Sequence, residues 1–285
     1  MKARAFLERW MQGVFALIAC VSVAAVALVY GFLLIGGIPA LDEIGLLEFL
    51  LGRSWKPGMN RYGILPMILG SVYITAGAML LGVPLGVLTA VWLARFCPKP
   101  LYRRAKPAVE LLAGIPSIVY GFFGLMVMVP LVRRLLGGSG KSILTASVLL
   151  GVMILPSVIS VAESALQAVP GSYYEGALAL GATHERAVFT VVLPAARSGI
   201  LAGAGLGLGR ALGEATAVAM VAGNQTAMPY SLLRGVRTLT TNIIMEMGYA
   251  EGLHRQALFA TGAVLFVLIL LINFCAGRMK EGEPL

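Results

Sequence analysis

The chain of 285 residues is 59% hydrophobic and only 12% charged, and its mean hydropathy is +0.88. A soluble domain carries about twice that charged fraction, so the composition excludes an ordinary soluble protein and indicates an integral membrane protein. The net charge of +9 does not indicate a nucleic-acid partner. The Lys and Arg residues lie mostly in short segments between apolar runs, where such residues set orientation across a membrane.

Six apolar runs follow one another, and we predict an all-α transmembrane fold with one helix for each run. A helix needs roughly 20 apolar residues to cross a bilayer. The first run is longer than the roughly 7–15-residue core of a signal peptide, so we expect it to be retained. The runs cover about residues 14–35, 64–94, 109–132, 143–162, 199–222 and 257–276.

The segments between the runs predict the topology. Residues 95–106 carry five basic residues and no acidic one, which indicates a cytoplasmic loop. Because six spans return the chain to its starting side, both termini are expected to be cytoplasmic. We divide the chain into residues 1–63, with the N-terminal tail, the first span and an external loop from residue 36, and residues 64–285, a five-span core. This core includes a cytoplasmic segment, residues 164–198.

The longest ordered polar stretch is SYYEGALALGATHERAVFTVVLP, residues 172–194. Ser172 and Glu175 are spaced as an S-x-x-E capping box, and Gly181 suits the left-handed geometry that ends a helix. Thr183 is placed to cap a second helix. We therefore predict two short helices joined at a glycine, which either receive an external partner or pack only against the protein itself.

This stretch resembles the EAA loop of ABC importer permeases, whose pattern is E-A-A, three residues, G, nine residues and I-x-L-P. The matching positions are Glu175, Ala177, Gly181, Leu193 and Pro194. Gly176 replaces the second Ala of the pattern, and Val191 replaces the Ile. The resemblance implies a type I importer bundle of six helices with cytoplasmic coupling helices, in which these matching residues contact a cleft of an ATPase subunit.

Two other stretches resemble phosphate importer permeases, namely GIPSIVYGFFGL in the third run and GLGRALGEATAVAMVAGN in the fifth. The second is similar to the signature of the C-type subunit of these importers, and the resemblance extends over about residues 109–273. It implies ATP-driven import of phosphate across a bacterial inner membrane. The implied partners are an A-type permease, two ATP-binding subunits, an external phosphate-binding protein and membrane lipid.

The chain itself carries no signal for catalysis, a cofactor or a metal. It lacks the G-x-x-x-x-G-K-[ST] phosphate loop, so ATP and Mg are expected on the partner subunits. Cys20, Cys97 and Cys275 are far apart, and neither His184 nor His254 has metal-like partners nearby in the sequence. We therefore expect a transporter subunit that is not an enzyme.

Arg210 and Glu214 are the ionisable residues well inside the fifth run, where charges are functional by default. Their i, i+4 spacing predicts that both lie on one helix face. Either they only neutralise each other, or they bind substrate. In the second case Arg210 offers a forked guanidinium to two phosphate oxygens, and Glu214 accepts a hydrogen bond from a P–OH that sulfate lacks. Arg237 is a loop cation that would guide the anion inward.

Other functions stay open at this point. A permease for another oxyanion or small solute would share every feature above. A secondary transporter usually needs an internal repeat with broken helices, and no repeat is evident in the sequence. An intramembrane enzyme would need a nucleophile–base or metal constellation within the spans, which neither histidine provides.

Overall fold

The computed structural model describes the main chain of residues 2–281 and the side chains of residues 10–274. Within these limits the regular secondary structure is helical apart from a hairpin of β1 (Trp55–Lys56) and β2 (Arg61–Tyr62), and an irregular stretch covers residues 222–238. Five of the described helices are long and apolar enough to cross a membrane. A sixth candidate, Arg197–Gly213, passes the same test only together with the preceding His184–Ala195, from which it is bent by 68°. The predicted all-α membrane fold is confirmed.

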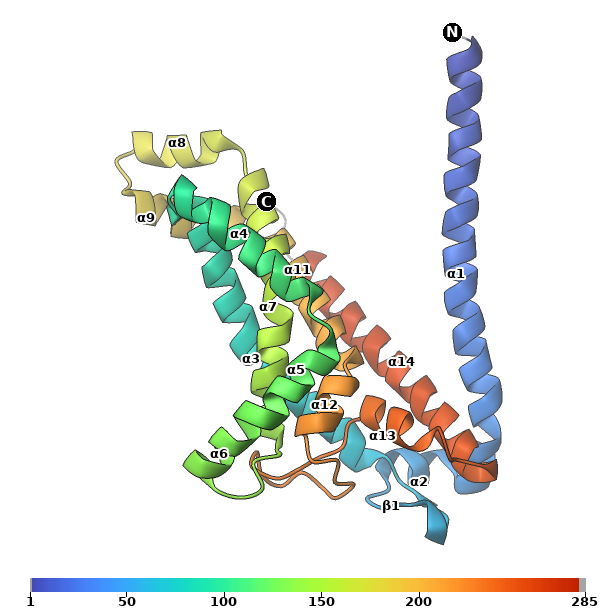
Figure 1. Ribbon diagram of the computed structural model, residues 1–285. Helices are drawn as coiled ribbons and strands as arrows, with labels where there is room; N and C mark the ends of the chain where they lie inside the picture. The colour runs from blue at the N-terminus through green and yellow to red at the C-terminus, as the bar shows by residue number, and fades with distance from the viewer. Residues whose placement is uncertain (1, 282–285) are drawn as a thin grey trace.

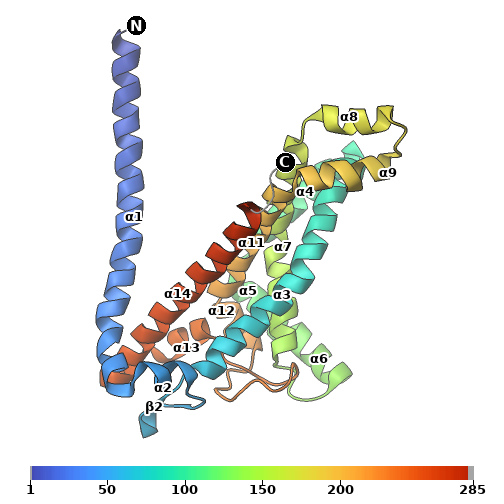
Figure 2. The same cartoon turned by 180° about the vertical axis from the view of Figure 1, so that it is seen from behind.

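The spans alternate in direction, so that α1 begins and α14 ends on the same side of the molecule (Figures 1 and 2). In chain order the spanning elements are α1 (Lys2–Ile44), α3 (Leu65–Val91), α5 (Ser117–Phe123) with α6 (Val129–Leu136), α7 (Ile143–Ala168), α11 (Arg197–Gly213) with α12 (Thr216–Val221), and α14 (Gly252–Glu281). One π-helical turn, Trp92–Phe96, extends α3, and another, Gly124–Met128, joins α5 to α6.

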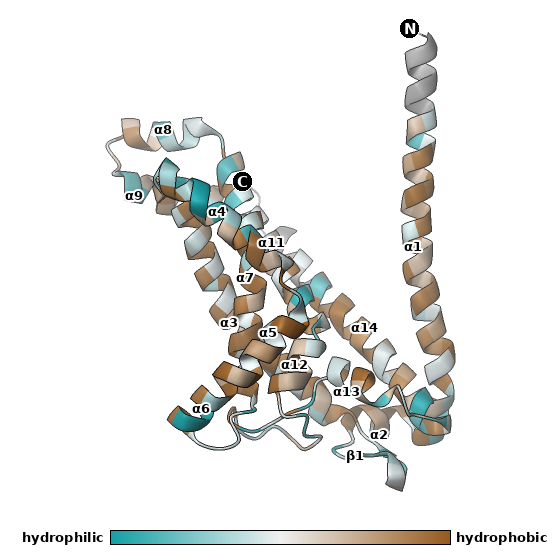
Figure 3. Cartoon of the chain, in the orientation of Figure 1, coloured by the Kyte–Doolittle hydropathy of each residue, from teal (hydrophilic) through white to brown (hydrophobic). Residues whose placement is uncertain are grey.

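Shorter elements lie at the two ends of the bundle (Figure 1). The terminal end, as we call it, holds α4 (Lys99–Gly114), α8 (Gly171–Ala179) and α9 (His184–Ala187) beside the described ends of the chain. The hairpin end holds α2 (Leu46–Leu51), the β1–β2 hairpin and α13 (Leu239–Glu246). Hydrophobic residues dominate the spans, whereas α4 and the tip of α6 carry hydrophilic ones (Figure 3).

Helix α4 corrects the predicted start of the third span, because residues 109–114 belong to this separate helix. Arg103, Arg104 and Lys106 make α4 too polar for the apolar core of a membrane. Ile115, which follows it, is extended with φ −70° and ψ 125°, as expected for a residue that precedes a proline. The third span therefore begins only at α5.

Two other predicted boundaries were wrong. Helix α1 continues through residues 36–44, which the sequence analysis assigned to an external loop. Contacts with α14 sustain this extension, since Ala40 is fully buried and a Cβ on Gly37 would lie only 2.7 Å from the Ala260 nitrogen. Helix α7 ends at Ala168 instead of 162, so the first residues of the segment 164–198 continue that helix.

Glycines bring α11 close to α7 along one face of α11. A Cβ on Gly199 would lie 2.3 Å from the Ala165 Cβ, and one on Gly207 would lie 3.1 Å from a Val158 methyl group. By contrast, nothing lies within 4 Å of such an atom on Gly205 or on Gly209. Small residues at one interface let membrane helices approach closely, so one glycine face of α11 packs and the other stays open.

We expect Gly199→Ala to destabilise the purified chain by about 1–3 kcal/mol, the usual range for overpacking, because the added methyl collides with Ala165. Gly205→Ala is the matched control in the same helix, and it should be neutral or stabilising by up to about 1 kcal/mol because alanine favours helix. Thermal unfolding in detergent measures both variants. Equal melting temperatures for the two would contradict this packing.

Candidate substrate path and coupling surface

A break in the fifth span separates α11 from α12. Helix α11 ends at Gly213, Glu214 is extended with φ −72° and ψ 123°, and α12 begins at Thr216. The Glu214 side chain accepts a hydrogen bond from the Ala217 main-chain nitrogen at 3.0 Å. This bond satisfies one of the main-chain N–H groups that the first turn of α12 leaves without a helical partner. The prediction that Arg210 and Glu214 lie on one helix face was therefore wrong.

The two charged side chains do not pair with each other. Arg210 Nη1 donates to Ser157 Oγ on α7 at 3.4 Å, and no ion pair joins Arg210 to Glu214 within the described structure. Both side chains are half-buried. Mutual neutralisation is thus not what accommodates these charges. The remaining guanidinium nitrogens and the second Glu214 carboxylate oxygen are left able to bind a polar ligand.

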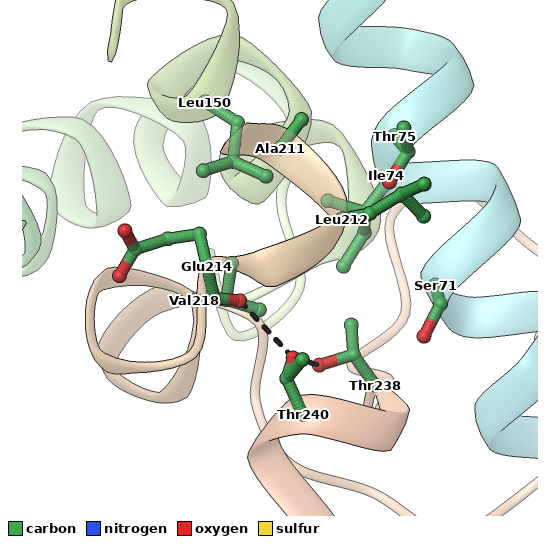
Figure 4. A pocket seen from close by; sticks show the side chains of 10 residues that line it. All are labelled: Ser71, Ile74, Thr75, Leu150, Ala211, Leu212, Glu214, Val218, Thr238 and Thr240. Atoms are coloured by element: carbon green, nitrogen blue, oxygen red, sulfur yellow. Dashed lines mark hydrogen bonds between the residues drawn. The ribbon is translucent and has the colours of Figure 1, made fainter. Parts of the chain in front are cut away.

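Hydroxyl groups surround the main chain of the break rather than the carboxylate. Figure 4 shows Ser71 and Thr75 of α3 beside Thr238 and Thr240, with the Glu214 carboxylate pointing away from them. Thr240 Oγ1 donates to the Glu214 main-chain carbonyl at 3.1 Å. The space between these groups is too narrow to hold a water molecule. Sequence analysis missed these residues because uncharged hydroxyls between apolar residues carry no distinctive pattern.

Arg237 belongs to a buried polar network at the hairpin end. Its Nη1 donates to Asn242 Oδ1 at 3.0 Å and pairs with Glu246 Oε1. The other carboxylate oxygen, Oε2, accepts from Trp55 Nε1 at 2.8 Å and lies 2.8 Å from His254 Nε2. The network joins the β1–β2 hairpin to α13 and α14. Arg237 is therefore held by neighbours, and its role in guiding an anion stays a prediction.

The pKa of the Glu246 carboxyl reflects this network. Burial raises the pKa, but hydrogen bonds from Trp55, His254 and Arg237, together with the Arg237 charge, outweigh burial and hold it below the ordinary value of 4.5. A carboxylate with a lowered pKa stabilises the fold above its unfolded pKa, and this contribution is lost as pH falls through the folded value. The network should therefore weaken in acid, below pH 4.5.

The segment at residues 172–194 folds as two short helices, as predicted. Gly181 has φ +85° and closes α8 in a Schellman motif, in which Ala182 N bonds Ala177 O at 3.1 Å and Gly181 N bonds Leu178 O at 2.9 Å. Thr183 Oγ1 accepts from the first turn of α9 at 3.3 Å. Beyond α9, a π-helical turn (Val188–Val192) and α10 (Leu193–Ala195) lead to α11.

The predicted capping box of Ser172 and Glu175 is absent from α8. This helix begins at Gly171 with Pro170 at the N-cap, and no side chain caps it. Because the helix starts two residues earlier than the pattern implied, with its N-cap at Pro170 instead of Ser172, Ser172 lies inside the first turn and cannot act as the N-cap. The Glu175 side chain is thus free of the local role predicted for it and is exposed.

One side of this segment is anchored, and the other is exposed. Tyr174 Oη lies 2.7 Å from His184 Nδ1, and the His184 ring is 4.7 Å from that of Phe96 at the end of α3. Val188 is fully buried against the bundle. In contrast, α8 buries none of its residues, and Leu180 at its tip is 92% exposed. Of the motif residues, Glu175, Gly181 and Pro194 are exposed, and Ala177 and Leu193 are half-buried.

A second buried carboxylate ties α4 to α7 next to this segment. Glu163 is 1% exposed and accepts hydrogen bonds from Tyr102 Oη and Lys106 Nζ, each at 2.7 Å. Burial lowers the pKa of Lys106, but the hydrogen bond and charge of Glu163 outweigh it, so the pKa lies above its usual value. Sequence analysis missed this pair. The available signal was Glu163, a single acidic residue directly after the apolar run 143–162, together with the basic segment 95–106, which contains Lys106.

Comparison with known proteins identifies the family. Residues 82–280 match the family described as the binding-protein-dependent transport system inner membrane component. The chain belongs to this family of permeases. The match confirms the resemblance to ABC importer permeases that the segment 175–194 indicated, and it makes the chain a multi-pass inner membrane protein.

Individual relatives cover most of this permease. It is 37% identical to the probable ABC transporter permease protein YqgH of Bacillus subtilis, over 92% of this chain and 88% of the relative. It is 38% identical to the phosphate transport system permease protein PstC of Mesorhizobium japonicum, over 86% of this chain and 81% of the relative. PstC of Haemophilus influenzae is 34% identical, over 94% and 92%.

Solved structures support the fold of the permease. A chain of the MetNI methionine ABC transporter matches with a TM-score of 0.64 and 24% identity, over 80% of this chain and 98% of that chain. A chain of a bacterial alginate ABC transporter also matches with a TM-score of 0.64, at 16% identity over 94% and 93%. At these identities the likeness concerns the fold alone.

We expect Glu246→Gln to destabilise the permease by about 3–5 kcal/mol at neutral pH, because it leaves the Arg237 guanidinium buried without a counter-charge. The loss of stability that the parent chain shows below pH 4.5 should become smaller in this variant. Thermal unfolding from pH 3.5 to 7 measures both effects. Glu251→Gln, which alters an exposed carboxylate nearby, is the control and should behave as the parent. A Glu246→Gln variant as stable as this control would refute the network.

Proposed function

We propose that this permease is the membrane subunit of an ATP-driven importer of inorganic phosphate and is not itself an enzyme. One observation carries the proposal. Arg210 lies inside α11, and among the described residues its guanidinium donates only to Ser157, in a chain whose relatives include phosphate permeases at 38% and 34% identity. A half-buried cation without an ionic partner is costly in a membrane, and an anionic substrate would offset that cost.

Arg210 and Glu214 would meet phosphate from the two sides of the break. The free nitrogens of the Arg210 guanidinium donate to phosphate oxygens, where a planar fork matches the geometry. The free oxygen of the Glu214 carboxylate accepts from the P–OH of HPO4²⁻, while its other oxygen stays on Ala217. Fully ionised sulfate has no such proton and would be repelled. Arg237 is assigned to guiding the anion toward this site from the hairpin end.

The membrane orientation follows from charge. We assign the terminal end to the cytoplasm because α4 and the end of α3 carry its basic residues there, namely Arg95, Lys99, Arg103, Arg104 and Lys106. Both termini and the segment 164–198 are then cytoplasmic. We retain the division into residues 1–63 and a core at 64–285. The hairpin end faces the external phosphate-binding protein.

The proposed partners match the exposed surfaces. Two ATP-binding subunits would hold ATP and Mg, and one of them would receive α8 and the residues that follow it, with contacts at Glu175, Ala177, Gly181, Leu193 and Pro194. A second, A-type permease and lipid would cover α1, which packs on α14 but leaves most of its apolar surface exposed (Figures 1 and 3). No nucleic acid is involved, and no cofactor or metal is assigned to this chain.

Movement of α8 would reach the substrate path through contacts that are already in place. Tyr174 links α8 to His184 on α9, and the His184 ring contacts Phe96 on the extension of α3. Val188, directly after α9, is buried in the same apolar cluster as Ile159 and Leu166 of α7. ATP-driven closure of the partner subunits therefore pushes on helices α3 and α7, which pack against α11. Such rigid-body shifts of packed elements are a common form of switching.

A permease for another oxyanion or small solute is the second candidate within the same class. Such a permease would have the same fold and the same exposed helix α8, and the solved structures with this fold are of transporters for methionine and alginate. The distinction rests on Arg210 and Glu214, since only a protonated oxyanion satisfies both a guanidinium and a carboxylate.

We expect Arg210→Ala and Glu214→Gln to reduce phosphate uptake by about 10–100-fold, the usual effect of removing one hydrogen bond to a charged group. Glu214→Gln should also narrow the preference for phosphate over sulfate, because the amide does not repel sulfate. The assay is ATP-dependent, vanadate-sensitive uptake by vesicles that hold the four-component assembly. Arg134→Ala, an exposed cation at the hairpin end, is the control. Normal phosphate uptake by both site variants would contradict the assignment of Arg210 and Glu214 to the substrate site. Uptake of sulfate by the parent at the same rate as phosphate would contradict it as well.

We expect Leu180→Asp to weaken binding of the ATP-binding subunit about tenfold or more, because it puts a charge into an apolar contact. The melting temperature of the isolated chain should not change, since the side chain is exposed. Met59→Asp, which changes another exposed apolar side chain at the hairpin end, is the control and should leave the affinity unchanged. Co-purification and titration with the ATP-binding subunit measure the effect, and unchanged binding of Leu180→Asp would rule out this docking surface.

A further inference from the structure

Helix α12 is held at both ends by the stretch of chain at residues 236–240. This stretch makes three hydrogen bonds to carbonyls that flank α12 and are left without helical partners. They run from Val236 N to Ala222 O at 2.8 Å, from Arg237 Nε to Asn224 O at 3.2 Å, and from Thr240 Oγ1 to Glu214 O at 3.1 Å. We name this stretch the α12 clamp. Its Thr240 contact is the one that reaches the break.

The position of Thr240 is fixed by the N-terminus of α13. Thr238 and Thr241 form a reciprocal capping box, in which each hydroxyl accepts from the main-chain nitrogen of the other residue, at 3.2 and 2.8 Å. Ser71 of α3 accepts from Leu239 N at 3.0 Å. The Thr238 and Thr240 hydroxyls are 2.9 Å apart. Because the carbonyl can only accept, the single proton of the Thr240 hydroxyl goes to Glu214. The Thr238 hydroxyl also has one proton, and it faces two acceptors, Thr240 Oγ1 and, at 3.0 Å, Thr241 Oγ1.

The Glu214 carbonyl depends on this one donor. It lies where α11 has ended, so no helical N–H reaches it, and Thr240 is its hydrogen-bond donor among the residues that the structure describes. Thr240 is only 8% exposed, Ala211, Leu212 and Val218 line the same narrow space, and no water fits between. Main-chain polar groups in an apolar bundle must be satisfied internally. A rotation of the Glu214 peptide that broke the Thr240 contact would therefore leave the Glu214 carbonyl without a hydrogen-bond donor.

We propose that Thr240 is a positioning residue for substrate transfer, which holds the Glu214 peptide in the orientation that directs Glu214 and α12 relative to Arg210. The carbonyl and the carboxylate belong to the same residue, so a change in the peptide plane moves the carboxylate and the start of α12. Thr240 itself need not touch the substrate. The inference rests on the proposed function, since the substrate assigned to Arg210 and Glu214 is phosphate.

The test compares Thr240→Val, which keeps the shape but removes the donor, with Thr240→Ser, which restores it. Thr261→Val is the matched control, because Thr261 is a buried threonine as well and donates to a carbonyl of its own helix, Ala257 O. The first readout is hydrogen–deuterium exchange of residues 214–222 in the full chain. The second is phosphate transported per ATP hydrolysed by the complete assembly in vesicles, with the loaded binding protein outside.

For Thr240→Val we expect faster exchange at residues 214–222 and at least a fivefold drop in phosphate moved per ATP. Thr240→Ser and Thr261→Val should stay near the parent. The ratio is independent of how much assembly forms, so a merely unstable variant does not lower it. Unchanged exchange, or an unchanged ratio, in Thr240→Val would overturn the inference. If the parent assembly moves no phosphate, the proposed function fails, and the exchange result alone then decides whether Thr240 holds the break.

Discussion

The rest of the structure depends on how main-chain groups are satisfied where the fifth span is interrupted. Inside an apolar bundle a carbonyl that leaves its helix must find a donor within the protein. At Glu214 that donor is Thr240, brought in from a segment 26 residues later. The helix α11 has already ended when the chain reaches the extended Glu214, and α12 begins only at Thr216. Arg210 and Glu214 are thereby kept apart instead of pairing as neighbours on one helix.

The close approach of α11 to α7 offsets part of the stability that the break at Glu214 costs. Gly199 and Gly207 let α11 lie directly on α7, which compensates for the lost helical hydrogen bonds with dispersion contacts. The open glycine face of the same helix, at Gly205 and Gly209, leaves room beside Arg210. One helix thus supplies both a rigid contact and an unfilled surface, and a path for a small anion needs both.

The two ends of the bundle divide the remaining tasks. At the terminal end, α8 is exposed, while His184 and Val188 anchor the segment that follows it against α3 and α7. At the hairpin end, the Arg237–Glu246 pair locks the hairpin, α13 and α14 together. The α12 clamp extends from this locked region to the break. The proposed substrate site at Arg210 and Glu214 therefore lies between the exposed helix α8 at the terminal end and the buried Arg237–Glu246 network at the hairpin end.

Sequence alone determined the membrane class, six passes, the glycine-ended pair of helices at residues 172–194 and the importer family, because hydropathy, turn chemistry and motif spacing are local properties. It also singled out Arg210 and Glu214, since charges in an apolar run are conspicuous. It could not place the break, the separate helix α4, or the partners of Arg237 and Glu163. Those depend on donors that are distant in sequence, such as Thr240 and Trp55. Only tertiary structure decides which buried polar group meets which, because each must be satisfied by whatever the fold brings near.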